Sequence, residues 1–239
     1  MEGSLQRAVI FAGGRGTRMG KCETIKPLVN VKGLPIIDRV IDSIRFAGID
    51  RISVVISEYT KELRMHRRNG IELDYLLINR NDLAHAILEV ILLLHEPFIG
   101  ISADKVIHSD SIVQLLDTTS KSKSAFCVLL SSKALPQRFL IYQTHGCLLR
   151  SIQRSNEPQS TDIVGVSINC TSSHGKEIIK WAKDRNADLA LSHSLPDWES
   201  LMVNAINSGL DVDIVWTDNP IVNINRQEDI KLAESFIRE

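Results

Sequence analysis

Two continuous apolar stretches, "RAVIFA" (7–12) and "RISVVIS" (51–57), place the strongest constraint on the fold of this chain. Both are rich in β-branched residues and lack polar alternation, which is typical of strands buried on both faces of a parallel sheet. Between them, residues 35–48 carry apolar side chains at helical spacing, with Pro35 at the start and Gly48 at the end. This strand–helix–strand order predicts an α/β fold with parallel strands.

The same alternation continues through the first half, and the second half changes to closely spaced short strands. We expect strands at 71–78 and 97–104 and, between them, a helix at 83–94 with Asp82 as its N-cap. The later expected elements are strands at 124–132, 138–143, 147–152 and 162–169, helices near 173–184 and 196–208, and a strand at 212–216. Together they predict one three-layer α/β domain with a mixed, mostly parallel sheet and a small antiparallel insertion.

Composition limits the compartment and the partners. The chain has 239 residues, 44% of them hydrophobic, which is enough for a sizeable core. Its formal net charge of −1 gives no overall field that would attract nucleic acid or an acidic membrane, and we expect neither partner. The apolar runs at 7–11 and 89–94 are too short for a signal peptide or a membrane span, and the four cysteines form no C-x-x-C pair. We therefore expect a cytoplasmic protein without a zinc or redox site.

The glycine-rich segment "AGGRGTRMG" (12–20) directly follows the first expected strand. It fails the two best-known phosphate-loop patterns. A Walker A loop would need glycine in place of Arg15 and Ser or Thr in place of Cys22. A dinucleotide fingerprint that starts at Gly14 would need glycine in place of Met19.

The segment nevertheless has the chemistry of an anion site. Gly13, Gly14 and Gly16 allow the backbone N–H groups to approach phosphate oxygens closely. Arg18 adds a two-pronged cation, and Lys26 adds a point charge shortly afterwards. The alternative is a sharp turn with incidental surface arginines. Because Arg15, Arg18 and Lys26 all follow the end of the first strand closely, we prefer the anion site.

The loop, together with "KPL" at 26–28, closely resembles the signature of the NTP-transferase family. That family includes sugar-1-phosphate nucleotidyltransferases, inositol-phosphate and choline-phosphate cytidylyltransferases, and molybdenum-cofactor and adenosylcobinamide-phosphate guanylyltransferases. Weaker similarities follow in the family's order, although Asp82 replaces a family glycine: "NDLAHAIL" (81–88), "GISADKV" (100–106), "DIVGVSIN" (162–169) and "IVNINRQEDIKLAE" (221–234).

The resemblance implies a Rossmann-like fold of the nucleotide-diphospho-sugar transferase type, with an NTP-binding half at about 1–118 and an acceptor-binding half at about 119–239. It implies the reaction NTP + R-phosphate → NDP-R + pyrophosphate, with Mg²⁺ as cofactor. The partners would be an NTP and a phosphorylated small molecule, and a homodimer is compatible with it. Arg18 and Lys26 would be catalytic. The implied NTP-binding residues are Ala12, Gly13, Gly14, Gly16, Thr17, Arg18, Asn79, Asn81 and Ala84.

The resemblance also implies metal and acceptor ligands. Asp104 would bind Mg²⁺ because it ends a strand at the carboxyl edge of the sheet, although it could instead cap the next turn. Asn223 would be the second metal ligand, whereas we expect Asn225 to cap the last helix in a capping box with Glu228. The implied acceptor-binding residues are Gly165 and Asp162, and a strand bulge is the alternative role of the glycine.

Three functions remain open. The first is transfer to a sugar-1-phosphate or a related alcohol phosphate, and the second is GTP-dependent guanylyl transfer to adenosylcobinamide phosphate. The third is a non-catalytic regulator that binds a nucleotide or a sugar, since fold alone does not establish activity. The sequence does not reveal the base of the NTP, because base selection depends on a few placed hydrogen bonds.

Overall fold

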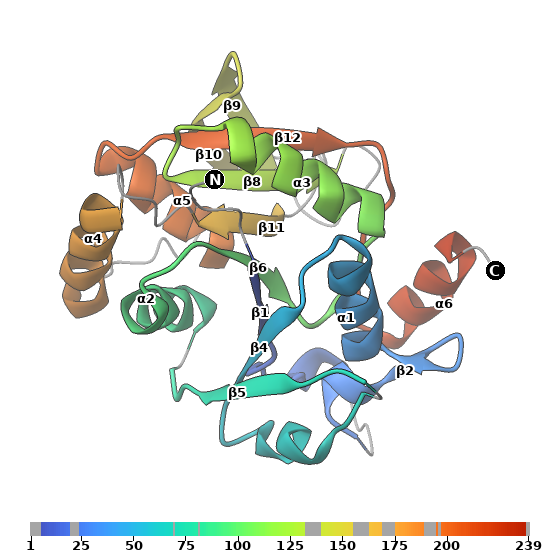
Figure 1. Ribbon diagram of the computed structural model, residues 1–239. Coiled ribbons are helices and arrows are strands. Elements are labelled where there is room, and N and C mark those ends of the chain that lie inside the picture. Colours follow the sequence, from blue (N-terminus) through green and yellow to red (C-terminus); the bar gives the residue numbers. More distant parts are fainter. Residues whose placement is uncertain are drawn as a thin grey trace.

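The computed structural model describes residues 6–19, 24–68, 70–80, 82–131, 140–154, 163–168, 175–188, 195 and 197–237. Within these residues, nine strands form one sheet in the order β5-β4-β1-β6-β11-β8-β12-β10-β9 (Figure 1). The strands are β1 (Arg7–Phe11), β4 (Arg51–Ile56), β5 (Leu73–Leu77), β6 (Phe98–Ser102), β8 (Phe126–Ser131), β9 (Leu140–His145), β10 (Leu148–Arg154), β11 (Ile163–Ile168) and β12 (Val212–Thr217).

The sheet is mixed and mostly parallel, as predicted. Strand β1 pairs in parallel with β4 and β6, β4 with β5, and β8 with β12. Strands β11 and β10 run antiparallel to their neighbours. The predicted antiparallel region is thus built into the same sheet, and β11 lies near its centre between β6 and β8. Strands β9 and β10 form an antiparallel hairpin whose turn contains Gly146 with φ +61°, a conformation that tight hairpin turns favour.

Helices cover both faces of the sheet, as a three-layer fold requires (Figure 1). Alternate residues of β1 point to opposite faces. Val9 and Phe11 belong to a core with α2 (Leu83–Leu94), α4 (Gly175–Asp188) and α5 (Asp197–Asn207). Ala8 and Ile10 belong to a second core with α1 (Ile36–Phe46) and α3 (Ser109–Lys121). Helix α3 was not predicted from the sequence.

A smaller apolar cluster lies at one end of the sheet. It joins α6 (Gln227–Phe236) to the two-stranded pairs β2–β3 and β7–β13, with bounds Asn30–Val31, Leu34–Pro35, Lys105–Val106 and Val222–Asn223. Three short 3₁₀ helices complete the described elements: η1 (Thr17–Met19), η2 (Lys26–Leu28) and η3 (Lys61–Met65). The buried side chain of Met19 belongs to this cluster and so ties the glycine loop to it.

The start of α6 differs from the prediction. The helix begins at Gln227, and the residue before it is Arg226 rather than Asn225. Asp229, not Glu228, supplies the capping carboxylate: its Oδ2 accepts the backbone N–H groups of Asn225 and Arg226 at 2.7 and 2.8 Å. Because the box is shifted by one residue, the Asn225 side chain is not needed for capping.

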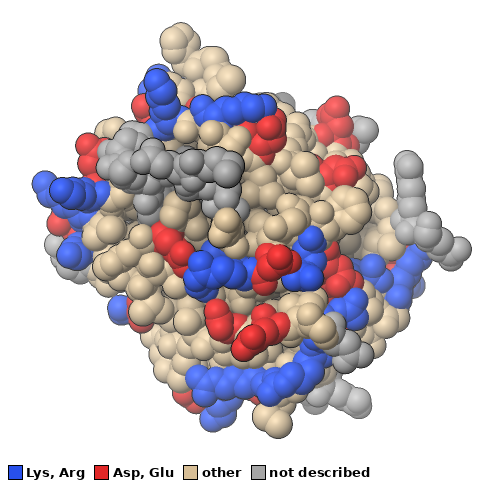
Figure 2. All heavy atoms as spheres, in the orientation of Figure 1, with Lys and Arg blue, Asp and Glu red and all other residues tan. Residues whose placement is uncertain are grey.

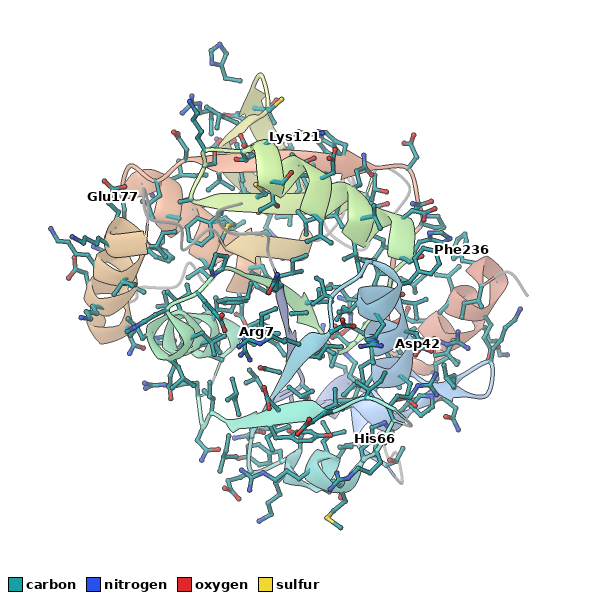
Figure 3. All side chains as sticks on the ribbon, viewed as in Figure 1. Arg7, Asp42, His66, Lys121, Glu177 and Phe236 are labelled. Atoms are coloured by element: carbon teal, nitrogen blue, oxygen red, sulfur yellow. The ribbon has the colours of Figure 1, made fainter. Side chains whose placement is uncertain are left out.

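A buried arginine stabilises the amino edge of the parallel strands (Figure 3). Arg7, at the start of β1, donates to the Ser53 hydroxyl at 2.6 Å and forms ion pairs with Glu96 and, at 3.4 Å, with Asp74. These partners come from β4, β5 and the segment before β6, so the arginine holds neighbouring elements in register. Its guanidinium is occupied by structural contacts.

The surface carries both charge signs. Figure 2 shows Lys and Arg side chains interspersed with Asp and Glu side chains over the visible face. None of the described helices combines the length and the apolar character needed to cross a membrane. Of the cysteines that the structure describes, Cys127 is buried and Cys147 is exposed, and both are free thiols.

Candidate active site

The sheet topology creates a crevice at the carboxyl ends of β1 and β6. From β1 the chain continues to β4 on one side, whereas β6 lies on the other side. Ligands of open α/β sheets bind at such a reversal of strand order. Phe11 and Ser102 are paired in register, and the N–H of Ala103 donates to the carbonyl of Phe11 at 2.9 Å. The segments that follow the two strands therefore leave the sheet at the same level.

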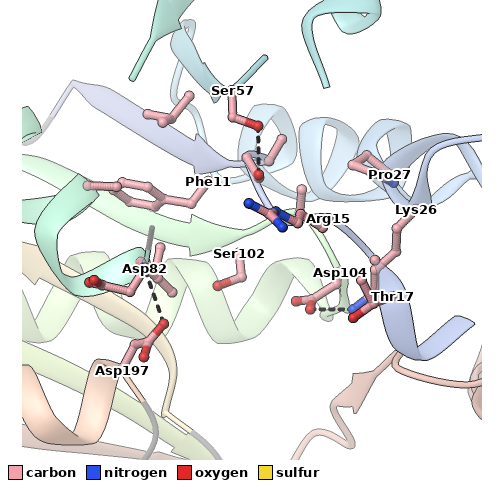
Figure 4. Close-up of a pocket in the computed structure, with 18 of the residues that line it drawn as sticks. Phe11, Arg15, Thr17, Lys26, Pro27, Ser57, Asp82, Ser102, Asp104 and Asp197 are labelled. Atoms are coloured by element: carbon pink, nitrogen blue, oxygen red, sulfur yellow. Dashed lines mark hydrogen bonds and ion pairs between the residues drawn. The ribbon is translucent and has the colours of Figure 1, made fainter. Parts of the chain in front are cut away.

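A cleft with a volume of about 340 Å³ opens at this edge (Figure 4). Its walls come from the glycine loop, the ends of β4, β5 and β6, and the amino-terminal ends of α2 and α5. The lining residues are Phe11, Ala12, Gly13, Gly14, Arg15, Gly16, Thr17, Arg18, Met19, Lys26, Pro27, Val55, Ser57, Ile78, Arg80, Asp82, Leu83, Ala86, Ser102, Ala103, Asp104, Asp197 and Asn225.

Lys26 joins three distant segments inside the cleft. Its Nζ donates to Asp104 Oδ2 at 2.7 Å and to Asn225 Oδ1 at 3.2 Å. The backbone N–H of Ile224 donates to the carbonyl of Asp104 at 2.8 Å, which fixes the two chain segments beside each other. The closing segment of the chain is thereby brought against the end of β6, next to the glycine loop.

The environment of Lys26 lowers the pKa of its ammonium group. Burial is the largest cause, since only 11% of the side chain is exposed. The carboxylate of Asp104 opposes this effect, and the nearby charges of Arg18 and Lys105 add to it. Lys26 is thus a partly desolvated cation, and a desolvated cation interacts more strongly with a phosphate than a hydrated one.

The glycine loop packs tightly against Lys26. Gly16 has φ +65°, a conformation that L-residues with a side chain rarely adopt, and a Cβ at this position would lie 3.1 Å from the Lys26 Cβ. The carbonyl of Gly13 accepts a hydrogen bond from the Ser57 hydroxyl at 2.8 Å, which anchors the start of the loop. The guanidinium of Arg15 lies 4.1 Å from the centre of the Tyr59 ring.

The residues around Asp104 fit a magnesium ion. Asp104 Oδ1 is buried and, within the described part of the chain, accepts no hydrogen bond. The amide oxygen of Asn225 lies close by, because both residues contact the same Lys26 ammonium. Mg²⁺ prefers such hard oxygen ligands and commonly takes one or two from protein and the others from phosphates and water. No group of three His, Cys, Asp or Glu side chains that could hold a metal occurs among the described residues.

Comparison with known proteins decides the family. The family model for MobA-like NTP transferase domains matches residues 8–162, which is well over half of the chain. The chain belongs to this family. The glycine loop, Lys26 and Asp104 all lie inside the matched region of the NTP transferase domain.

Two further similarities support the family. A 57-residue segment is 49% identical to 2-aminoethylphosphonate cytidylyltransferase of Lancefieldella rimae, but it covers only 23% of this chain and 23% of that protein. The fold resembles that of a Bacillus anthracis protein named as a glucose-1-phosphate thymidylyltransferase, solved with sucrose (TM-score 0.75, 17% identity, 96% of this chain and 94% of that chain). It equally resembles the inositol-1-phosphate CTP transferase of T. maritima (TM-score 0.75, 14% identity, 99% and 98% coverage). At these identities the structural similarity concerns the fold alone.

Most of the predicted site residues of this NTP transferase domain lie together. Those that line the cleft are Ala12, Gly13, Gly14, Gly16, Thr17, Arg18, Lys26 and Asp104. Arg18 is exposed in η1, so its guanidinium is accessible to a ligand.

Three other predicted residues do not line the cleft. Asn79 is exposed, and its amide oxygen accepts the N–H of Glu58 at 3.2 Å. Ala84, a residue of α2, is fully buried in the core. Asn223 is buried in β13 opposite Lys105, whereas Asn225 lines the cleft. None of these three therefore contributes to the cleft lining.

The predicted acceptor residues are only partly described. Gly165 lies in β11 beside Leu129, and the register shifts between Ile163 and Gly165, as the alternative role in a bulge requires. Asp162 lies outside the described residues, as does Asn81.

Two charged residues of the cleft, Arg80 and Asp197, were not predicted from the sequence. Arg80 forms an ion pair with Glu89 on α2. Asp197 starts α5, and its Oδ2 accepts the N–H of Leu83 at 3.0 Å. Leu83 and Asp197 are 114 positions apart, so no local pattern indicates this contact.

Proposed function

We propose that this chain transfers a nucleoside monophosphate group from an NTP to a phosphorylated small molecule and releases pyrophosphate. The acceptor is a sugar-1-phosphate or a related alcohol phosphate. One observation carries the proposal: a buried lysine contacts an aspartate at 2.7 Å beside a glycine loop, at the carboxyl ends of β1 and β6. The names of the two structural neighbours mention glucose-1-phosphate and inositol-1-phosphate, which supports an acceptor of this kind. The name of the third similar protein mentions an aminoethylphosphonate, which shares the phosphoryl oxygens of these acceptors but not their ester bond.

The reaction needs no protein nucleophile. An oxygen of the acceptor phosphate attacks the α-phosphorus and forms a new P–O bond, while the bond to the β-phosphate oxygen breaks and its electron pair leaves with pyrophosphate. Catalysis then depends on positioning and on stabilising negative charge. Lys26 would contact the α-phosphate and the acceptor phosphate, where charge develops. Arg18 and the N–H groups of the glycine loop would hold the β- and γ-phosphates.

Magnesium bound at Asp104 would neutralise phosphate charge during the transfer. The contacts favour Asn225 over the predicted Asn223 as the second protein ligand of the metal. Asn225 and Asp104 both accept a hydrogen bond from the Lys26 ammonium and therefore lie close together. Asp104 has a second role that needs no metal: its carboxylate holds Lys26 in place and offsets the cost of burying the lysine cation. The homodimer and the cytoplasmic location stay predictions.

The decisive experiment measures pyrophosphate release. The purified chain is incubated with Mg²⁺ and each of CTP, UTP, GTP, dTTP and ATP, crossed with hexose-1-phosphates, polyol phosphates, 2-aminoethylphosphonate and cobinamide phosphate. We expect release only when one nucleotide is paired with a sugar or alcohol phosphate. Activity with GTP and cobinamide phosphate alone would replace this proposal by the guanylyltransferase. No release from any pair would favour the non-catalytic regulator.

A further inference from the structure

One end of the cleft is an apolar recess. Phe11, Val55, Ile78 and Ala86 line it, and all four are at most 8% exposed. In Figure 4 this end, marked by Phe11, lies on the opposite side of the view from Lys26 and Asp104. An apolar recess connected to a cationic loop suits a ligand that has a flat apolar ring at one end and phosphates at the other.

Two carboxylates border this recess at the amino-terminal end of α2. Asp82 Oδ1 accepts the N–H of His85 at 2.8 Å, and the carboxylate also contacts the His85 ring at 2.7 Å. Asp197 Oδ2 accepts the N–H of Leu83 at 3.0 Å. The helix dipole favours negative charge at this position, which explains how two aspartates lie beside the same helix end.

Asp197 keeps hydrogen-bonding capacity on the cleft side. Within the described part of the chain, its Oδ1 accepts no hydrogen bond, and the residue lines the cleft. Arg80, which lines the cleft close to Asp82 in sequence, forms an ion pair with Glu89, which is not part of the lining. Asp197 Oδ1 therefore offers a hydrogen-bond acceptor to a ligand in the cleft.

We propose that the recess holds the base of the NTP and that Asp197, supported by Asp82, selects bases with an exocyclic amino group. The proposal rests on the proposed function and names its nucleotide class. An ionised carboxylate can only accept hydrogen bonds. Cytosine, adenine and guanine each offer an amino group, whereas uracil and thymine place a carbonyl oxygen where cytosine has its amino group. If the base presents this position to Asp197 Oδ1, the oxygen of uracil or thymine would face a carboxylate without a proton between them, and the site would disfavour it.

The first test measures nucleotide binding without catalysis. Isothermal titration of the full chain compares CTP, GTP, ATP, UTP and dTTP, with inorganic tripolyphosphate as a probe of the phosphate end alone. The tightest-binding nucleotide should carry an amino group and should bind at least about ten-fold more tightly than both UTP and dTTP. Equal or tighter binding of UTP or dTTP would overturn the base selection.

The variant Asp197→Asn tests the residue itself. Asparagine retains an oxygen that can accept the N–H of Leu83. Its amide also donates, so the preference for the amino-bearing nucleotide over UTP should fall about ten-fold or more, while the affinity for tripolyphosphate stays within about two-fold. Asp110→Asn, which removes a carboxylate from the first turn of α3 outside the cleft, should leave both quantities unchanged.

The outcomes separate the two proposals. If Asp197→Asn left the ratio of affinities for the amino-bearing nucleotide and UTP unchanged, this carboxylate would not select the base. If the variant does not fold, the nucleotide ranking of the wild-type chain still decides whether amino-bearing bases are selected. Absence of binding by every NTP and by tripolyphosphate would refute the proposed function and the base selection with it. Tight tripolyphosphate binding without discrimination between bases would refute the base selection alone.

Discussion

Replacing Gly16 by alanine tests whether the glycine loop is built around Lys26. The structure predicts two separate penalties. A left-handed backbone conformation costs an L-residue about 1–2 kcal/mol, and Gly16 has φ +65°. The new Cβ would also lie 3.1 Å from the Lys26 Cβ, so the lysine must move by a few tenths of an ångström. In a chain of this size, the first penalty alone lowers Tm by about 2–4 °C per kcal/mol.

Two matched glycines separate these penalties. Gly33 has φ +74°, and a Cβ added there would have no atom within 4 Å. Gly33→Ala therefore introduces the backbone strain without a new contact. Gly14→Ala introduces neither a positive φ nor a contact and controls for stability. Because a misplacement of 1 Å at a reacting group can cost about 10²-fold in rate, we expect a smaller displacement of Lys26 to lower kcat/KM about ten-fold.

Thermal melts followed by circular dichroism and pyrophosphate-release kinetics measure the two effects on the same preparations. Gly16→Ala should melt at least as low as Gly33→Ala and below Gly14→Ala, and it should lose activity that Gly33→Ala retains. A Gly16→Ala variant as stable as Gly14→Ala would refute the backbone argument. If its kcat/KM equalled that of Gly33→Ala, the loop would not position Lys26.

Four further variants or conditions follow from the contacts. Lys26→Met should lower kcat by about 10²–10³-fold with an unchanged circular dichroism spectrum, and intact turnover would contradict its role. Because the pKa of Lys26 is lowered, rising pH removes its proton earlier than it would from an unperturbed lysine. We therefore expect kcat/KM to fall as the pH rises toward the lowered pKa. The variant Lys26→Arg keeps its charge over this range and should not show the decline. Asp104→Asn should raise the Mg²⁺ concentration for half-maximal rate about ten-fold or more, which an unchanged titration would exclude. Arg7→Met should lower the free energy of unfolding by about 1–3 kcal/mol in urea titrations while kcat/KM stays unchanged, since the described contacts of the arginine are structural and it does not line the cleft.

The sequence was sufficient for features that depend on neighbouring residues. The predicted helix at 83–94 is α2 itself, and Asp82 caps it as expected. The glycine loop could be placed because it directly follows a strand. Asp104 could be placed opposite that loop because the carboxyl ends of parallel strands meet at one edge of a sheet.

Features that depend on packing between distant segments were missed or misplaced. The strand order, with β11 reversed inside the sheet, is determined by which apolar faces pack together and not by any local pattern. Two asparagines in the closing segment, Asn223 and Asn225, have nearly the same local sequence context. Contacts with distant segments separate them: Asn223 pairs with Lys105 in β13, the N–H of Ile224 donates to the carbonyl of Asp104, and Asn225 contacts Lys26.

Buried charge alone would not have identified the site, because both edges of the sheet contain it. At the amino edge, Arg7 has two carboxylates and a hydroxyl around one guanidinium, so its hydrogen-bonding groups are occupied within the fold. At the carboxyl edge, Asp104 retains a buried oxygen without a hydrogen bond among the described residues, and the burial of Lys26 lowers the pKa of its ammonium. A fold tolerates such incompletely satisfied groups at a cost in stability. Their location beside a cleft and a glycine loop is what the proposed binding of a triphosphate with Mg²⁺ requires.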